Sequence, residues 1–192
     1  MVYCMPEENI SSKPILIPPM VSYLIRKAQE DPVKFWDEVA KSETDLIYWK
    51  RLWDKTFEWE ENKPYRWFIG GITNAEYSHI DFPVEKGFAN KAIYIYENAE
   101  LGITKTYTYY QFLDLVKRYA ASMRALGIKK GDRITVYMPT KVESIAVFHA
   151  AARIGAIATP VFAGFSAGAL RDRILLTEPK LLFTQDFNMR RG

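Results

Sequence analysis

Apolar positions in the second half of the chain follow two alternating periods. Residues 92–96 and 104–107 are short runs rich in β-branched and aromatic residues, which predict two strands of a hairpin. Residues 109–126 then carry apolar side chains three and four positions apart, which predicts an amphipathic helix. Thr108 and Gln111 have the spacing of a capping box, so this helix is expected to begin directly after Thr108.

The alternation continues toward the C-terminus. Three further strands are predicted, at residues 133–138, 156–162 and 181–184. Helices are expected between them, one opened by a capping box of Thr140 with Glu143 and one capped by Ser166. Strands that alternate with helices indicate βαβ crossovers and parallel pairing. The sequence therefore predicts an α/β fold, with a mainly parallel sheet flanked by helices.

The N-terminal half lacks this regularity. Residues 1–20 are proline-rich and predict an extended arm, whereas Asp31-Pro32 is typical of a helix start. Aromatic residues recur between positions 35 and 57 and predict a helical, aromatic-rich lobe that packs on the main domain. A ligand-binding aromatic box is the alternative interpretation. Residues 61–90 are rich in turn-forming residues and are interpreted as a connector.

These patterns divide the chain into two parts. Residues 1–90 hold the arm, the helical lobe and the connector, and residues 91–192 hold the α/β subdomain. No helix is predicted after the strand at 181–184, so the parallel sheet would keep an open edge there. We expect a missing C-terminal part, a second chain or another copy of this chain to cover that edge.

Composition excludes several classes of protein. The chain has 192 residues, of which 48% are hydrophobic and 26% charged, as in globular proteins. The formal charge of +3 is too small to favour nucleic acid as a partner. There is no apolar run of 18 residues, no signal-peptide pattern and only one cysteine, Cys4. We therefore expect a cytoplasmic protein without a disulfide framework or a membrane span.

Conventional catalytic motifs are absent from the sequence, including phosphate-binding glycine loops, nucleophile elbows and paired metal-binding cysteines. His79 and His149 are the only histidines. A packing or surface role is favoured over catalysis for His149, since no acid is close to it in sequence. His79 lies near Asp81, and two such residues are a weak indication of a metal site.

The turn at Phe162, Ala163 and Gly164 is more informative. It leaves a strand and leads into a helix, where the free backbone N–H groups and the helix dipole attract anions. In an ordinary turn, the alternative, Gly164 would only supply conformational freedom. Arg190 and Arg191 follow the last strand and suit a phosphate at the same rim, unless they are simply solvated charges.

Five segments of the chain resemble AMP-forming acyl-CoA synthetases, and among them the acetyl-CoA synthetase branch. They are WFIGGITN at 67–74, KGDR with YMP at 130–139, ARIGA at 152–156, VFAGFS at 161–166 and TQD with RRG at 184–192. The resemblance implies the first part of a larger adenylate-forming domain, from an enzyme that joins a carboxylate to coenzyme A with ATP and Mg²⁺.

The resemblance also implies a partial site for coenzyme A. Its residues would be Phe162, Ala163, Gly164, Arg190, Arg191 and Gly192. Two of these depart from the family pattern, since Ala163 and Arg191 both stand where the family usually has glycine. Together with departures at residues 75–76, 82–83 and 158–160, they favour an acyl substrate other than acetate, namely a propionyl, hydroxyacyl or medium-chain group. The family's phosphate loop, acyl pocket and catalytic lysine would lie beyond Gly192. We therefore expect that ATP and Mg²⁺ bind only in a complete enzyme; a catalytically inactive binding module is the alternative.

Overall fold

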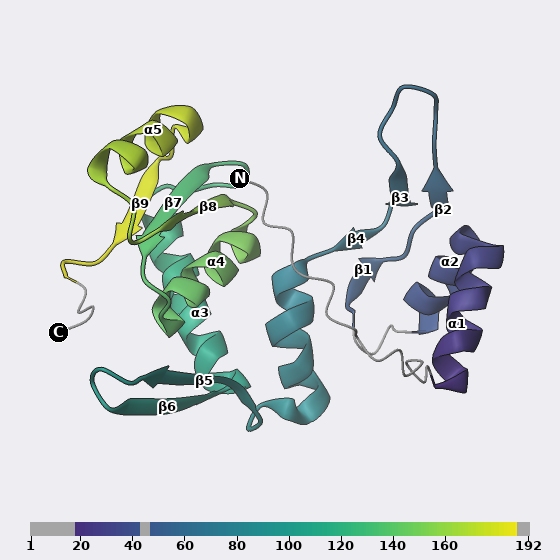
Figure 1. The fold of residues 1–192 in the computed structure, drawn as a ribbon, viewed down its shortest axis with the longest axis horizontal. Coiled ribbons are helices and arrows are strands. Elements are labelled where there is room, and N and C mark those ends of the chain that lie inside the picture. Colours follow the sequence, from purple (N-terminus) through teal and green to yellow (C-terminus); the bar gives the residue numbers. More distant parts are fainter. Residues whose placement is uncertain (1–17, 43–46, 188–192) are drawn as a thin grey trace, which may run out of the picture.

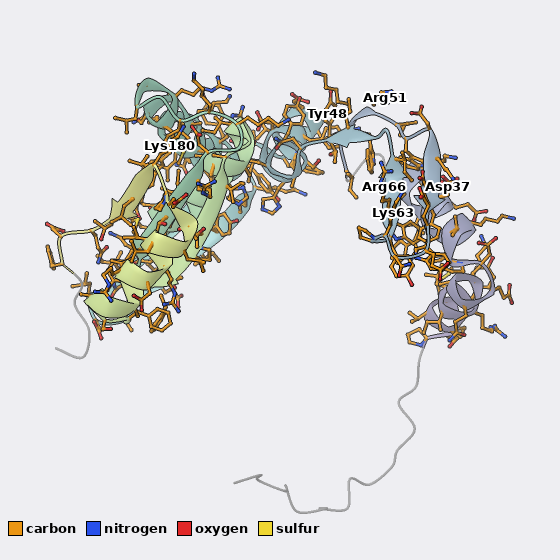
Figure 2. All side chains as sticks on the ribbon, turned by 90° about the horizontal axis from the view of Figure 1, so that it is seen from above. Asp37, Tyr48, Arg51, Lys63, Arg66 and Lys180 are labelled. Atoms are coloured by element: carbon orange, nitrogen blue, oxygen red, sulfur yellow. The ribbon has the colours of Figure 1, made fainter. Side chains whose placement is uncertain are left out.

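The structure is a computed structural model that describes residues 18–42 and 47–187. It consists of an N-terminal lobe (residues 18–42 and 47–73), a connector (residues 74–91) and an α/β unit (residues 92–187) (Figure 1). Figure 2 shows Asp37, Arg51 and Arg66 in the N-terminal lobe at one end of the molecule and Lys180 in the α/β unit at the other. The expected extended arm, residues 1–20, lies almost wholly outside the described residues. Cys4 also lies outside them.

The N-terminal lobe combines helices with strands. Its elements are α1 (Pro19–Glu30), α2 (Pro32–Ser42), β1 (Trp49–Arg51), β2 (Lys55–Glu58), β3 (Arg66–Ile69) and β4 (Ile72–Thr73). The predicted start of α2 is confirmed, because the backbone N–H of Lys34 donates to Asp31 Oδ1 at 2.9 Å. The prediction of a helical, aromatic-rich lobe holds for α1 and α2 but was wrong after residue 48. There the chain forms two antiparallel pairs, β1 with β4 and β2 with β3.

Aromatic packing explains these strands. The rings of Trp49, Trp53 and Phe68 meet edge to face, with centroids 4.7–5.5 Å apart. Asp37 of α2 accepts hydrogen bonds from Trp53 Nε1 at 2.8 Å and from Thr56 Oγ1 at 2.5 Å, which ties α2 to the strands. A hydrogen bond from Lys41, together with these two, lowers the pKa of Asp37 to about 2. The aromatic residues are therefore packing residues, as favoured over a ligand box, but Trp49, Trp53 and Phe68 pack on one another within the lobe and not on the main domain as predicted.

Residues 61–90 were predicted to be a connector made of turns, but residues 66–69 and 72–73 form β3 and β4. The connector of the structure, residues 74–91, is largely helical. It contains two π-helical segments, η1 (Tyr77–Asp81) and η2 (Val84–Phe88). Such wide turns are rare and concentrate at functional sites in other proteins. Gly87 interrupts η2 with φ of 89°, a value that glycine adopts without strain. The connector carries His79 and Asp81 toward the α/β unit.

The α/β unit follows the predicted order closely. Its elements are β5 (Ala92–Asn98), β6 (Ile103–Thr108), α3 (Tyr109–Ala125), β7 (Arg133–Met138), α4 (Val142–Ile154), β8 (Ile157–Phe162), α5 (Ala167–Thr177) and β9 (Leu181–Thr184). The hairpin of β5 with β6 is confirmed, as are the three later strands. The capping box of Thr108 with Gln111 is also present.

One predicted helix cap was wrong. The residue that caps α4 is Lys141, not Thr140, and the expected box with Glu143 does not form. Instead, the backbone N–H of Lys141 donates to Ser144 Oγ at 3.1 Å. Gly155 ends the helix with φ of 75°, in the left-handed conformation that glycine favours.

The three strands β8, β7 and β9 form the parallel sheet, with β7 in the centre. Ile134 of β7 lies beside Ala158 on one side and Leu181 on the other. Helices α3 and α4 cover one face, and α5 lies over the opposite face (Figure 1). A parallel sheet flanked by helices is thus present, but it has only three strands, and every other strand pair in the described residues is antiparallel.

The core lies between the sheet and helices α3 and α4. Its central members, all buried, are Phe112, Val116, Met123, Ile134, Val136, Ala146, Val147 and Ala150. The opposite side is poorly covered. Leu175 and Leu176 of α5 are 68% and 84% exposed, and α5 has no buried residue. In the described residues β8 and β9 pair with β7 alone, so both outer strands keep open edges. No described helix has the length and apolar character needed to cross a membrane.

Candidate functional site

The turn between β8 and α5 lies at the carboxyl end of the parallel sheet, where α/β proteins commonly bind ligands. The backbone N–H of Phe165 donates to the carbonyl of Phe162 at 3.0 Å, which closes the turn. Tyr137 at the end of β7 supports it, because its hydroxyl donates to the carbonyl of Phe165 at 2.8 Å. Gly164 is not among the described glycines with positive φ, so conformational freedom is not its role here.

Side chains on this rim leave an aromatic ring accessible. Phe162 is 61% exposed and meets Phe165 edge to face, with centroids 5.6 Å apart. The guanidinium of Arg173 lies 4.4 Å from the ring centre of Phe165, within cation–π range. Ser166 caps α5 as predicted, accepting from the N–H of Ala169 at 3.4 Å. The rim therefore offers a flat aromatic surface beside a helix N-terminus.

The second half of the predicted coenzyme A site cannot be placed. Arg190, Arg191 and Gly192 lie outside the described residues, and the last described residue is Phe187. The structure thus describes Phe162, Ala163 and Gly164 at the rim. Their meeting with the two arginines stays a prediction.

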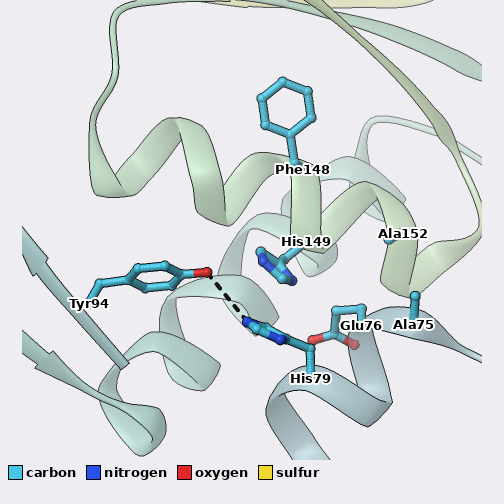
Figure 3. Close-up of a pocket in the computed structure, with 7 residues that line it drawn as sticks. All are labelled: Ala75, Glu76, His79, Tyr94, Phe148, His149 and Ala152. Carbon is cyan, nitrogen blue, oxygen red and sulfur yellow. Dashed lines mark hydrogen bonds between the residues drawn. The ribbon is translucent and has the colours of Figure 1, made fainter. Parts of the chain in front are cut away.

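A second candidate site lies between the connector and the α/β unit. It is an open pocket of about 450 Å³ (Figure 3). It is lined by Ala75, Glu76, His79, Tyr94, Phe148, His149 and Ala152. The residues come from η1 and the two helical residues before it, from β5 and from α4. This pocket brings together the two histidines that the sequence left apart.

The two imidazole rings are stacked. The ring centres of His79 and His149 are 5.2 Å apart and their planes differ by 18°. Tyr94 Oη lies 3.5 Å from His79 Nε2, and Phe112 meets the His149 ring edge to face. Burial, and secondarily the nearby His79, lowers the pKa of His149 to about 4, so this imidazole is neutral at pH 7. The prediction of a packing role for His149 agrees with these contacts.

A cluster of three charged residues joins the connector to α4, and this contact between the connector and α4 is called the junction. Arg153 Nη1 donates to both carboxylate oxygens of Glu76, at 3.0 and 2.8 Å. The same guanidinium donates to Asp81, at 2.5 Å from Nη1 and 2.9 Å from Nη2. Burial raises the pKa of Glu76 to about 7, against the attraction of Arg153, whereas the hydrogen bonds that Arg153 donates to Asp81 and Glu76, together with the charges of these acids, raise the pKa of Arg153. Two acids share one cation, which leaves the carboxylate of Glu76 under-compensated.

Sequence reasoning missed this cluster. Arg153 was singled out only as part of the ARIGA segment, and Glu76 was not treated as a candidate. The signal was weak, because 77 positions separate Glu76 from Arg153. Among the described residues no group of three or more histidines, cysteines and acids is arranged to hold a metal ion. The described part of the chain therefore does not support a metal site at His79 and Asp81.

Comparison with known families decides the identity of the chain. The family model described as AMP-binding enzyme matches residues 84–191, more than half of the chain. The chain belongs to this family. A second model, the acetyl-coenzyme A synthetase N-terminus, matches residues 22–78. These two matches confirm the resemblance inferred from the motifs.

Curated relatives agree with this assignment. The 3-hydroxypropionyl-coenzyme A synthetase of Sulfurisphaera tokodaii is 40% identical over 97% of this chain and 28% of its own length. The acetyl-coenzyme A synthetase of Deinococcus radiodurans is 40% identical over 87% of this chain and 25% of its own length. The 3-hydroxypropionyl-coenzyme A synthetase of Metallosphaera sedula is 40% identical over 89% of this chain. The chain spans about a quarter of the length of these relatives.

Proposed function

We propose that this chain forms the N-terminal part of an AMP-forming acyl-CoA ligase. The complete enzyme would convert a carboxylate, ATP and coenzyme A into acyl-CoA, AMP and pyrophosphate. The observation that carries the proposal is the ordered match to two family models, which together span residues 22–78 and 84–191. The names of the relatives favour a short carboxylate, acetate or 3-hydroxypropionate, as the substrate.

The contribution of this chain would be scaffold and one wall of the coenzyme A site. The rim at Phe162, Ala163 and Gly164 suits such a ligand, because its exposed phenylalanine can stack on a base and the start of α5 attracts a phosphate. Arg190, Arg191 and Gly192 would complete the wall. ATP and Mg²⁺ would be bound by the remaining part of the enzyme.

The remaining part of the enzyme would also cover the open side of the α/β unit. Leu175 and Leu176 on α5 are exposed apolar residues there, at 68% and 84%. Burying each such side chain would stabilise the interface by about 1.5–3 kcal/mol. We propose that a further part of the polypeptide, a second chain or another copy of this chain packs on this surface.

Complementation tests the function. The 192-residue chain would be mixed with the part of the Sulfurisphaera relative that follows its matched segment. Acyl-CoA formation from acetate, propionate and 3-hydroxypropionate would be measured, with each polypeptide alone as control. Acyl-CoA formation by the mixture, with none by either polypeptide by itself, supports the proposal. A stable complex that binds coenzyme A but forms no acyl-CoA would favour the alternative, an inactive binding module.

The coenzyme A wall has its own test. Replacing Arg190 and Arg191 with alanine should weaken binding of coenzyme A more than binding of 3′-dephospho-coenzyme A, since the arginines would contact the 3′-phosphate. Lys129→Ala and Lys130→Ala together, a change of equal charge elsewhere on the α/β unit, serve as the control. Equal losses for both ligands would contradict a phosphate site at the arginines.

A further inference from the structure

The connector is held on α4 by three kinds of contact. Arg153 binds Glu76 and Asp81 as described, and Asn74 Nδ2 donates to the carbonyl of Ala152 at 3.1 Å. The stack of His79 on His149 completes the junction. The two histidines and the buried ion pair therefore lie together at the junction. Both Glu76 and His149 line its pocket (Figure 3).

Burial shifts the pKa values of Glu76 and His149 in opposite directions. Glu76 is 2% exposed and shares its cation with Asp81, so water is lost without full compensation and the protonated acid is favoured. His149 lies against Phe112 and a second imidazole, so its neutral form is favoured. In water the imidazole is the stronger base of the two. Inside the junction Glu76 is the stronger base, because its pKa is raised to about 7 and that of His149 is lowered to about 4.

Other charged groups face the junction from each neighbouring element. Asp81 and His79 lie on η1, Arg153 lies on α4, and Lys117 on α3 acts on Glu76 through its charge. Arg124 of α3 lines a second pocket together with Arg153, and Tyr94 of β5 lines the pocket of the two histidines, where burial raises its pKa. Neither a phenol nor a guanidinium changes its charge between pH 5 and pH 8.

We propose that Glu76 and His149 are a compensating pair of proton sites, which keeps the attachment of the connector to α4 nearly independent of pH. Opening of the junction returns both groups to water. Acidification then favours the open form through His149, which binds a proton only when exposed. It favours the closed form through Glu76, which binds a proton more tightly when buried. The two effects oppose each other over the same pH range.

The effect of each group on the opening equilibrium of the junction can be followed from pH 8 to pH 5. With ordinary pKa values of 6.5 and 4.5 in the open form, His149 alone raises the opening equilibrium about 30-fold. Glu76 alone lowers it about 70-fold over the same range. Together they change it by less than about 3-fold. The junction would therefore stay closed to a similar degree throughout.

Hydrogen exchange measures this directly. Exchange of the backbone amides of residues 77–81 would be followed in the full chain at pH 5, 6.5 and 8, after correction for the intrinsic rate. Wild-type opening should change less than about 3-fold. In Glu76→Gln opening should rise about 30-fold from pH 8 to pH 5, whereas in His149→Phe it should fall about 70-fold. Glu143→Gln, on α4 but outside the pocket, should behave as wild type.

Two results would overturn the proposal. One is a wild-type change above about 10-fold between pH 8 and pH 5, and the other is the same direction of change in both variants. If a variant is too unstable for exchange, the wild-type imidazole signals provide a second measurement, assigned with His79→Gln. A His149 signal that titrates at pH 6 or above would refute the reversed order of the two groups. A titration below pH 5 would support it.

Discussion

Arg153 offers the sharpest test of how the connector is held. Its guanidinium makes four hydrogen bonds of 2.5–3.0 Å to Glu76 and Asp81, whose side chains are 1% and 10% exposed. Arg153→Ala leaves both carboxylates buried without their cation. Breaking a buried pair in this way costs about 3–5 kcal/mol of unfolding free energy. For a chain of this size that corresponds to a loss of roughly 6–20 °C in melting temperature.

The loss should depend on pH in a defined direction. Protonation removes the charge of the stranded Glu76 carboxylate, and the raised pKa of Glu76 indicates that it accepts a proton readily. Arg153→Ala should therefore be less destabilising at pH 5 than at pH 8. Urea unfolding at both pH values measures the difference.

A surface ion pair provides the matched control. Arg118 lies one helical turn from Asp114, 2.8 Å away, with side chains that are 77% and 54% exposed. Solvent screens this pair, so Arg118→Ala should leave stability within the error of the measurement. Equal losses in Arg118→Ala and Arg153→Ala would refute the reasoning, as would an Arg153→Ala loss that is the same at pH 5 and pH 8.

Two further predictions concern buried groups and glycines. Thr135 is fully buried and its hydroxyl has no hydrogen-bond partner within the described residues, so Thr135→Val should leave stability unchanged or raise it by up to about 1 kcal/mol in thermal unfolding. Thr177→Val, which removes a hydroxyl that donates to Arg173 O at 2.8 Å, should instead be destabilising; the opposite order would contradict the assignment. Gly155→Ala should cost about 1 kcal/mol, because φ is 75° and a Cβ would lie 2.9 Å from Lys130 Cγ. Gly168→Ala lies in the first turn of α5, where an added Cβ would meet only Ser166 Oγ at 3.9 Å, so it should stabilise by about 0.5 kcal/mol; a loss there would argue against the helix start at Ala167.

The sequence alone determined most of the α/β unit and the family. Strands β5 to β9 and helix α3 were predicted because their signals are local: alternation of apolar residues, a capping box at Thr108 and a glycine after the helix. The family motifs are equally local, since each is a short run of consecutive residues. Neither kind of signal depends on what a segment meets in the folded chain.

Only the tertiary structure decided the form of the N-terminal lobe and the second site. Trp49, Trp53 and Phe57 are spaced by four, as on a helix, yet pairing with residues 66–73 makes strands at two of these positions. Glu76, Asp81 and Arg153 are joined across 72 to 77 positions. The shifted pKa values of Glu76 and Arg153 follow from burial and from the sharing of one cation by two acids, which are properties of the assembled junction and of no single segment.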